Sequence, residues 1–363
     1  MPTSPPQTSQ QPMVDLDWQL VQDLLPDGWA EQARTSGAFQ RARKVKDPPA
    51  LLRLVLMHAG AGLSFQRTAE AARCTELAAM AKASVWERVQ RVGPWLDWLL
   101  TGMLSSRVCA PQVAGYRLRA VDATTLTGPA GKSPQRLHYS LSLTSLSCDQ
   151  VALSDAHLAE GLERFAVCAN DLLIGDRIYA RARGIAAVKQ AGGDVIVRLG
   201  RTSLTLYDEA GLPLDVLAWL RQAATGRPAE RSARFRDTHG NWIAGRLCAV
   251  RLGAKDAAHA RKRCLKSAQR RGAKLRATTL EAAGYLCLFT TAPAERLPMR
   301  TVLRLYRARW QIELAFKRLK SLLQADQIRE TSPASARIWL QGKMLYALLL
   351  QACLLRAGAF SPR

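Results

Sequence analysis

The segment from Tyr116 to Leu199 constrains the fold most strongly. It contains five short runs that are alternating or continuously apolar, as expected for strands at 116–122, 136–143, 151–155, 172–176 and 194–199. The pattern between the last three predicts two helices, at 158–167 and 180–190. Three strands in succession, followed by alternation of helix and strand, favour a mixed α/β sheet.

The rest of the chain divides around this segment. Residues 1–13 are rich in Pro, Ser and Gln and are expected to be disordered. Residues 14–112 have a helical pattern, which predicts an all-α N-terminal region. Within it, Ser64 is placed as the N-cap of a short helix, and a longer helix is expected at Ser84–Leu104. Two helices and a tight turn fit a helix-turn-helix or an ordinary helical bundle equally well.

The sheet segment, taken as 113–199, is the first part of an α/β core. Residues 200–291 are predicted to form a mostly β insertion, with strands at 203–207, 232–236, 242–252 and 284–290. Residues 292–357 complete the core with helices at 298–323 and 340–355. The longest apolar run, Met344–Leu355, is shorter than a bilayer of roughly 30 Å requires, so we expect a buried helix and no membrane partner.

The charge favours a polyanionic partner. The 363 residues carry 52 Lys and Arg against 29 Asp and Glu, a formal charge of +23, and nucleic acid is the first candidate. A ribosome-associated or merely soluble basic protein has the same balance. The run Lys255–Arg276 holds nine Lys or Arg and one Asp. Its candidate contacts to the DNA backbone are Arg261, Lys262, Arg263, Arg270 and Arg271, and the competing interpretation is a solvated helix face.

Cysteine usage indicates a reducing compartment. No two of the eight cysteines form a C-x-x-C pair, and none has a histidine at zinc-ligand spacing. We therefore expect reduced, mostly buried thiols in a cytoplasmic protein.

Three carboxylates stand at positions where chemistry is expected. Asp122 and Asp176 each end an apolar strand, where side chains project into a cleft at the sheet edge. Glu313 lies within the helix predicted at 298–323. At 3.6 residues per turn it falls within one stripe roughly 80° wide, whose members are Tyr306, Arg309, Glu313, Lys317 and Lys320. A separate apolar stripe is expected to pack inward and comprises Leu305, Ile312, Ala315, Phe316, Leu319 and Leu322. The charged stripe is either a salt-bridged solvated face or a surface that handles phosphates.

The run from Tyr306 to Lys320, YRARWQIELAFKRLK, resembles a known signature. It matches Y-x(2)-R-x(3)-E-x(6)-K of the insertion-sequence-4 family of DDE transposases without a mismatch. Val121–Thr124 resembles the first-Asp strand of that family, and Gly175–Ala180 resembles its second-Asp block, with Ile178 where a small residue is usual. The order of elements also agrees, and the resemblance covers roughly residues 50 to 355.

The resemblance implies a ribonuclease-H-like mixed sheet with a mostly β insertion. By matching position, Asp122, Asp176 and Glu313 are expected to hold two Mg²⁺ ions, with Mn²⁺ able to substitute, and Asp122 to bridge both. Two such ions roughly 4 Å apart support in-line phosphoryl transfer. The resemblance also implies that DNA phosphates are bound by Tyr306, Arg309 and Lys320. Lys317 lies on the same stripe of the helix. Trp310 is expected in core packing, with base stacking as the alternative.

The expected function is therefore that of a bacterial insertion-sequence transposase. It would cleave double-stranded DNA at transposon terminal repeats, join the ends to target DNA, work as a homodimer on paired ends and associate with the nucleoid. The rivals are a catalytically silent or domesticated DNA-binding protein and a nuclease of the same fold that cuts without strand transfer.

Overall fold

The computed structural model describes residues 13–105, 112–200, 203–222 and 227–360, and the chain forms two compact units. One consists of Met1–Val108, Leu126–Gln135 and Arg318–Arg363, and the other of Cys109–Thr125 and Arg136–Lys317. The tail predicted at 1–13 lies outside the described residues except for Met13, which begins α1 (Met13–Gln22).

The first unit is helical, as predicted. It contains α2 (Trp29–Thr35), α3 (Pro48–Val55), the π-helical turn η1 (Leu56–Gly60), α4 (Phe65–Cys74), α5 (Lys82–Val89), α6 (Gly93–Ser105) and α13 (Pro333–Phe360). The predicted N-cap of α4 is confirmed, because the Ser64 side chain accepts from the backbone N–H of Arg67. The single helix predicted at Ser84–Leu104 is wrong. A turn separates α5 from α6, and Pro94, which has no N–H, stands where a new helix begins.

Helix α13 is longer than the run predicted at 340–355. Its residues Pro333–Ala357 are long and apolar enough to cross a membrane, but 56% of the most apolar window is buried inside the protein. Two glycines permit this burial. A Cβ on Gly342 would lie 2.5 Å from the Cβ of Ala59, and one on Gly60 would lie 2.8 Å from the ring of Tyr346. The helix therefore packs closely on η1, as a core helix does.

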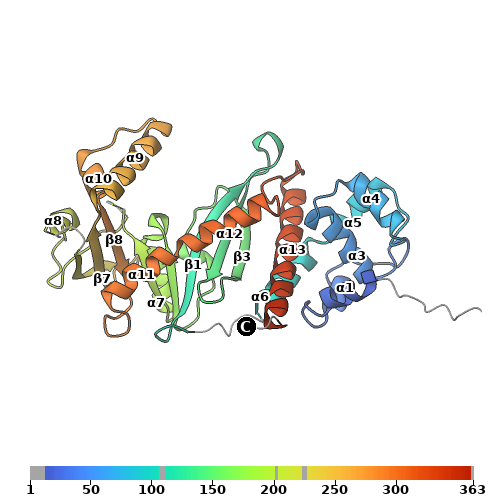
Figure 1. Ribbon diagram of the computed structural model, residues 1–363, viewed down its shortest axis with the longest axis horizontal. Coiled ribbons are helices and arrows are strands. Elements are labelled where there is room, and N and C mark those ends of the chain that lie inside the picture. The colour runs from blue at the N-terminus through green and yellow to red at the C-terminus, as the bar shows by residue number, and fades with distance from the viewer. Residues whose placement is uncertain (1–12, 106–111, 201–202, 223–226, 361–363) are drawn as a thin grey trace, which may run out of the picture. The chain divides into compact units, whose positions relative to one another are not determined.

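The second unit contains one eight-stranded sheet in the order β3-β2-β1-β4-β5-β8-β7-β6 (Figure 1). The strands are β1 (Arg117–Leu126), β2 (Gln135–Ser142), β3 (Cys148–Asp155), β4 (Asp171–Gly175), β5 (Asp194–Arg198), β6 (Pro228–Arg236), β7 (Trp242–Arg251) and β8 (Tyr285–Thr290). Strands β1, β4 and β5 run parallel, whereas β8 joins β5 antiparallel. The predicted mixed sheet is thus confirmed, and its strand order is consistent with a ribonuclease-H-like fold.

Alternation along the central strands builds a core on each face of this sheet. Leu173 packs in one core, and its neighbours Leu172 and Ile174 pack in the other. The first core is covered by α7 (Ala182–Gln190) and α8 (Val216–Arg221), and the second by α11 (Met299–Ala308). Strands buried on both faces read as continuous apolar runs, which explains why β4 and β5 were recognisable in the sequence.

Several local predictions are wrong. The segment 158–167 contains only a 3₁₀ turn, Leu162–Arg164, because Gly161 before it is fully extended. Within 203–207, only Tyr207 makes isolated bridges, to Pro213 and to Arg234. The helix predicted at 298–323 is interrupted at Arg309, between α11 and α12 (Trp310–Ser321).

Two further differences concern the insertion and the thiols. The described part of 200–291 also carries α8, α9 (Ala254–Arg270) and α10 (Ala277–Ala282), and its strands extend the core sheet. Among the described cysteines, Cys148, Cys248 and Cys287 are buried, and the exposed ones are Cys74, Cys168 and Cys353. The prediction of mostly buried thiols is therefore wrong, and Cys109 lies outside the described residues.

Candidate functional site

Asp122 and Asp176 lie at the same level on two neighbouring parallel strands. The β1–β4 register pairs Ala120 with Ile174, so each aspartate follows two residues after this pair. Leu118 and Ile174 point into the core beneath α11, and alternation places both carboxylates on that face. The prediction that Asp122 ends its strand is wrong, because β1 continues to Leu126. It lies where β1 has passed the end of β4.

Helices α11 and α12 carry the third acid across this face (Figure 1). Val302 and Leu303 of α11 are buried against the sheet. The ring of Phe316 in α12 lies 5.7 Å from that of Tyr139 in β2, and Ile312 is fully buried. These contacts fix which side of α12 faces the sheet, and Glu313 follows Ile312 on that helix as a largely exposed side chain.

Arg309 joins the helix to the strand. Its Nη1 lies 3.5 Å from Oδ2 of Asp122, and its Nη2 donates to Oε1 of Glu313 at 2.6 Å. The guanidinium side chain is 15% exposed, whereas that of Glu313 is 61% exposed. One half-buried cation thus contacts two of the three predicted acids.

The electrostatic environment of Asp122 is unusual for a carboxylate. Burial raises the pKa of Asp122 to about 6, and the neighbouring charges of Asp176 and Glu160 act in the same direction. The Ala123 N–H and Arg309 oppose the shift. Perturbed carboxylates of this kind gather at functional sites. From the sequence, Glu160 was expected to be a spare acid near the sheet and not a metal ligand, because the three matched positions already fill the site.

Two phenols also lie within the electrostatic influence of the acids. Burial raises the pKa of Tyr306, whose hydroxyl lies within the fields of Arg309, Arg198 and Asp176. Burial also raises the pKa of Tyr179, and Asp122, Glu160 and Asp176 add to the effect. Tyr179 belongs to the block that resembles the second-Asp segment, but no role was predicted for it or for Arg198, which ends β5, because their proximity to the acids depends on the packing of the sheet.

The donor chemistry suits a hard divalent cation, although the carboxylates are not drawn together around one point. Within the described residues, no three His, Cys, Asp or Glu side chains are grouped closely enough to hold a metal ion. Carboxylate oxygens are the ligands Mg²⁺ prefers. The buried Tyr179 hydroxyl has no hydrogen-bond partner in the described protein, and a hydrated ion beside Asp122 and Asp176 would supply one. The residues therefore fit such an ion, provided that Arg309 moves.

The predicted cations of the basic run lie on α9, except Arg271, which follows its last residue. Arg261, Lys262 and Arg263 are all exposed, as are Arg270 and Arg271. Only Ala257 and Ala260 of this helix are buried, so the helix presents its charge outward. Arg263 also contributes to the positive field at Arg198, which places α9 near the carboxyl end of β5.

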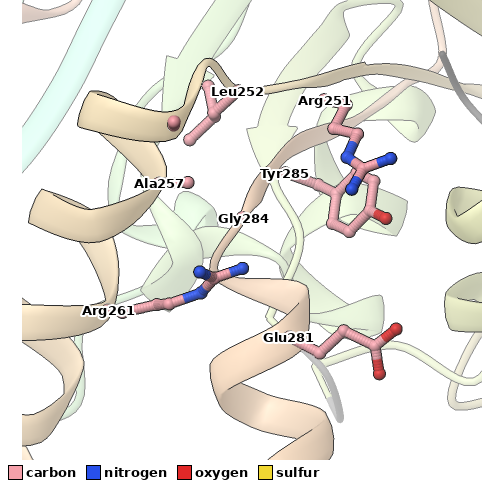
Figure 2. Close-up of a pocket in the computed structure, with 8 residues that line it drawn as sticks. Arg251, Leu252, Ala257, Arg261, Glu281, Gly284 and Tyr285 are labelled. Atoms are coloured by element: carbon pink, nitrogen blue, oxygen red, sulfur yellow. The ribbon is translucent and has the colours of Figure 1, made fainter. Parts of the chain in front are cut away.

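A hollow of about 380 Å³ lies beside α9 and is separate from the three acids. Figure 2 shows Arg251, Arg261 and Tyr285 around it. Glu281 also lines it, and both oxygens of that carboxylate accept from Arg221, at 2.8 and 2.9 Å. The hollow adds guanidinium groups to the basic surface but no reactive pair.

Two predictions for α12 are wrong. Trp310, expected in core packing, is 52% exposed, and Leu322, expected on the apolar stripe, is 75% exposed. The break at Arg309 ends one helical segment before Trp310, and α12 ends before Leu322. Lys317 is exposed and Lys320 is half-buried on α12, and their phosphate contacts remain predictions.

Comparison with known proteins agrees with this architecture. Residues 114–350 match the family model described as the transposase DDE domain. InsL, the candidate transposase for insertion sequence element IS186A of Escherichia coli strain K12, is 33% identical over 346 residues, covering 93% of each chain. The transposase for IS421 of Escherichia coli is 33% identical over 347 residues, again covering 93% of each chain.

A third relative, the transposase for IS231F of Bacillus thuringiensis subsp. israelensis, is 34% identical over 103 residues, covering 28% of this chain and 22% of that relative. The family model spans well over half of the chain, and two relatives match nearly all of it. This chain therefore belongs to the DDE transposase family.

Proposed function

We propose that this chain is an insertion-sequence-4 transposase in which Asp122, Asp176 and Glu313 hold two Mg²⁺ ions, with Mn²⁺ able to substitute. The observation that carries this proposal is the single guanidinium of Arg309 contacting both Asp122 and Glu313, while the β1–β4 register places Asp176 level with Asp122. Arg309 thus links two acids that are far apart in the sequence, and Asp176 lies on the same face of the sheet as Asp122.

The bound ions would activate a water or a 3′-hydroxyl and stabilise the leaving oxygen of an in-line phosphoryl transfer. The protein's own residues would position the DNA for that transfer. Tyr306 and Arg309 lie beside the acids, and Lys317 and Lys320 follow on α12; these groups would bind phosphates on either side of the scissile bond. Arginine suits this role because its planar fork matches two phosphate oxygens.

The DNA partners in this proposal are the double-stranded terminal repeats of an insertion sequence and its target. The exposed arginines and lysines of α9 would hold the backbone, and the N-terminal helices would bind the transposon ends. Two copies of the chain would act on paired ends, in the cytoplasm and close to the nucleoid.

The proposal is tested by separating chemistry from DNA binding on α12. Glu313→Gln preserves size but removes the charge that a metal ligand needs, so strand cleavage in Mg²⁺ should be lost while binding to a transposon-end duplex is retained. Lys320→Ala removes a cation, so binding or end positioning should weaken while metal binding survives. Gel-shift and cleavage assays on the same duplex measure both effects.

The outcomes distinguish the rival functions. A parent chain that binds DNA but never cleaves it would be the silent, domesticated protein. Cleavage without joining to a target duplex would identify the nuclease. Near-parent cleavage by Glu313→Gln would show that this carboxylate belongs only to a salt-bridged surface.

The proposed DNA interface has its own test. Phosphate contacts release counterions, so the logarithm of the affinity should fall linearly with the logarithm of the salt concentration, with a slope that scales with the number of contacts. Neutralising Arg261, Lys262, Arg263, Arg270 and Arg271 together should weaken binding and flatten that slope. An unchanged affinity and slope would remove α9 from the interface.

A further inference from the structure

Arg309 contacts the acids that the proposed function assigns to metal binding. Its Nη2 donates to Oε1 of Glu313 at 2.6 Å, and its Nη1 lies 3.5 Å from Oδ2 of Asp122. A guanidinium and a divalent ion compete for the same carboxylate oxygens. We propose that Arg309 is a latch, which holds the acids in the free protein and is released by DNA phosphate, so that metal and DNA bind cooperatively. This inference rests on the proposed function.

The latch can open only by movement of the side chain. Arginine is not deprotonated in proteins, and the bond to Glu313 and the charge of Asp122 both favour its charged form. A change of protonation therefore cannot free the acids. A divalent ion must instead displace a cation that is 15% exposed and already bonded to Glu313 at short distance.

The surroundings of Arg309 allow such a movement. The residue stands at the break between α11 and α12. The Arg309 N–H donates to the Tyr306 carbonyl, and the Ile312 N–H donates to the Arg309 carbonyl, so the hydrogen bonds here span three residues instead of four. The centroid of the Tyr306 ring lies 5.9 Å from the guanidinium carbon of Arg309. Glu313, at 61% exposed, is free to rotate once released.

A DNA phosphate is the competitor that would open the latch. It offers two oxygens to the guanidinium fork, as a carboxylate does. Transfer of Arg309 from Glu313 to a phosphate would leave both acids available to metal. Linkage then requires that metal strengthen DNA binding by the same factor as DNA strengthens metal binding. The device would keep the free protein poorly loaded with metal until DNA arrives.

The test compares two arginine substitutions on one helical segment. Arg309→Gln removes the latch, and Arg304→Gln removes the same charge from an exposed position of α11. Titration calorimetry with Mn²⁺ on the full chain without DNA should show about tenfold tighter binding for Arg309→Gln. Arg304→Gln should bind Mn²⁺ as the parent does.

The reciprocal measurement uses Ca²⁺, to avoid turnover, and the fluorescence anisotropy of a labelled transposon-end duplex. In the parent and in Arg304→Gln, Ca²⁺ should tighten DNA binding by about the same tenfold factor relative to EDTA. In Arg309→Gln this metal dependence should vanish. The latch is overturned if Arg309→Gln binds Mn²⁺ no more tightly than the parent does. It is also overturned if Ca²⁺ still tightens DNA binding by Arg309→Gln.

Two additional variants separate the possible failures. If Arg309→Gln does not fold, Arg309→Lys replaces it: a single ammonium cannot span both acids, so Mn²⁺ binding should again tighten, and unchanged binding overturns the latch. Asp122→Asn tests the metal site itself and should abolish the Mn²⁺ signal. If Asp122→Asn still binds Mn²⁺, the proposed function is refuted. If Asp122→Asn loses Mn²⁺ binding but Arg309→Gln binds Mn²⁺ as the parent does, only the latch is refuted.

Discussion

Breaking the buried ion pair at the start of β4 should cost several kcal/mol. At the start of β4, both oxygens of Asp171 accept from Arg117, at 2.5 and 2.7 Å, and one also accepts from Arg119 at 2.8 Å. The side chain of Asp171 is 1% exposed. Burial would raise the pKa of Asp171, but the bond from Arg117, the Cys168 N–H and the charge of Arg119 together hold that pKa below its usual range.

Asp171→Asn keeps the shape of the side chain but removes the charge that both arginines face. Breaking a buried pair on one side costs about 3–5 kcal/mol, because the remaining charge is left uncompensated. For a unit of this size, each kcal/mol lowers the melting temperature by roughly 2–4 °C. Multiplying the two gives an expected drop of about 6–20 °C, measured by scanning calorimetry.

The matched control has the same geometry at the surface. Glu281 binds Arg221 through two parallel bonds, at 2.8 and 2.9 Å, but the two side chains are 36% and 55% exposed. Glu281→Gln should leave the melting temperature nearly unchanged, because solvent screens exposed pairs. Equal shifts for the two variants would refute the reasoning that burial decides the strength of these pairs.

Three further outcomes are expected for the metal-free protein. Burial lowers the pKa of His58 from 6.5 to about 4, so the neutral imidazole stabilises the fold fully above pH 6.5, and this contribution, at most about 3 kcal/mol, is lost as the pH falls toward 4. Urea titrations across this range should show the loss, and in His58→Gln the unfolding free energy should depend less steeply on pH. Tyr179→Phe should raise the free energy of unfolding by about 1 kcal/mol, because it removes a buried hydroxyl without a partner; a lower unfolding free energy in urea would contradict this. Ser64→Ala should cost about 1 kcal/mol in the same assay, through loss of the bond to the Arg67 N–H, and no change would show that this cap is unimportant.

Local pattern alone determined much of the fold. The apolar runs at β4 and β5 were visible because both faces of these strands are buried, and the cap at Ser64 was visible because capping is a short-range interaction. Asp122, Asp176 and Glu313 were singled out from the strands and the motif that contain them, and their metal-binding role stays a prediction. The breaks before α6 and α12 were missed, since a helical period continues across a kink of one to three residues.

Tertiary packing decided what surrounds the acids. The β1–β4 register, and not the end of β1, places Asp122 level with Asp176. Contacts such as Phe316 with Tyr139 fix the face of α12, and so place Arg309 between Asp122 and Glu313. Glu160, Tyr179 and Arg198 reach the same place from separate loops and strands. Periodicity describes only one element at a time, so proximity between elements, and the pKa of Asp122 that depends on it, could be determined only by the packed sheet.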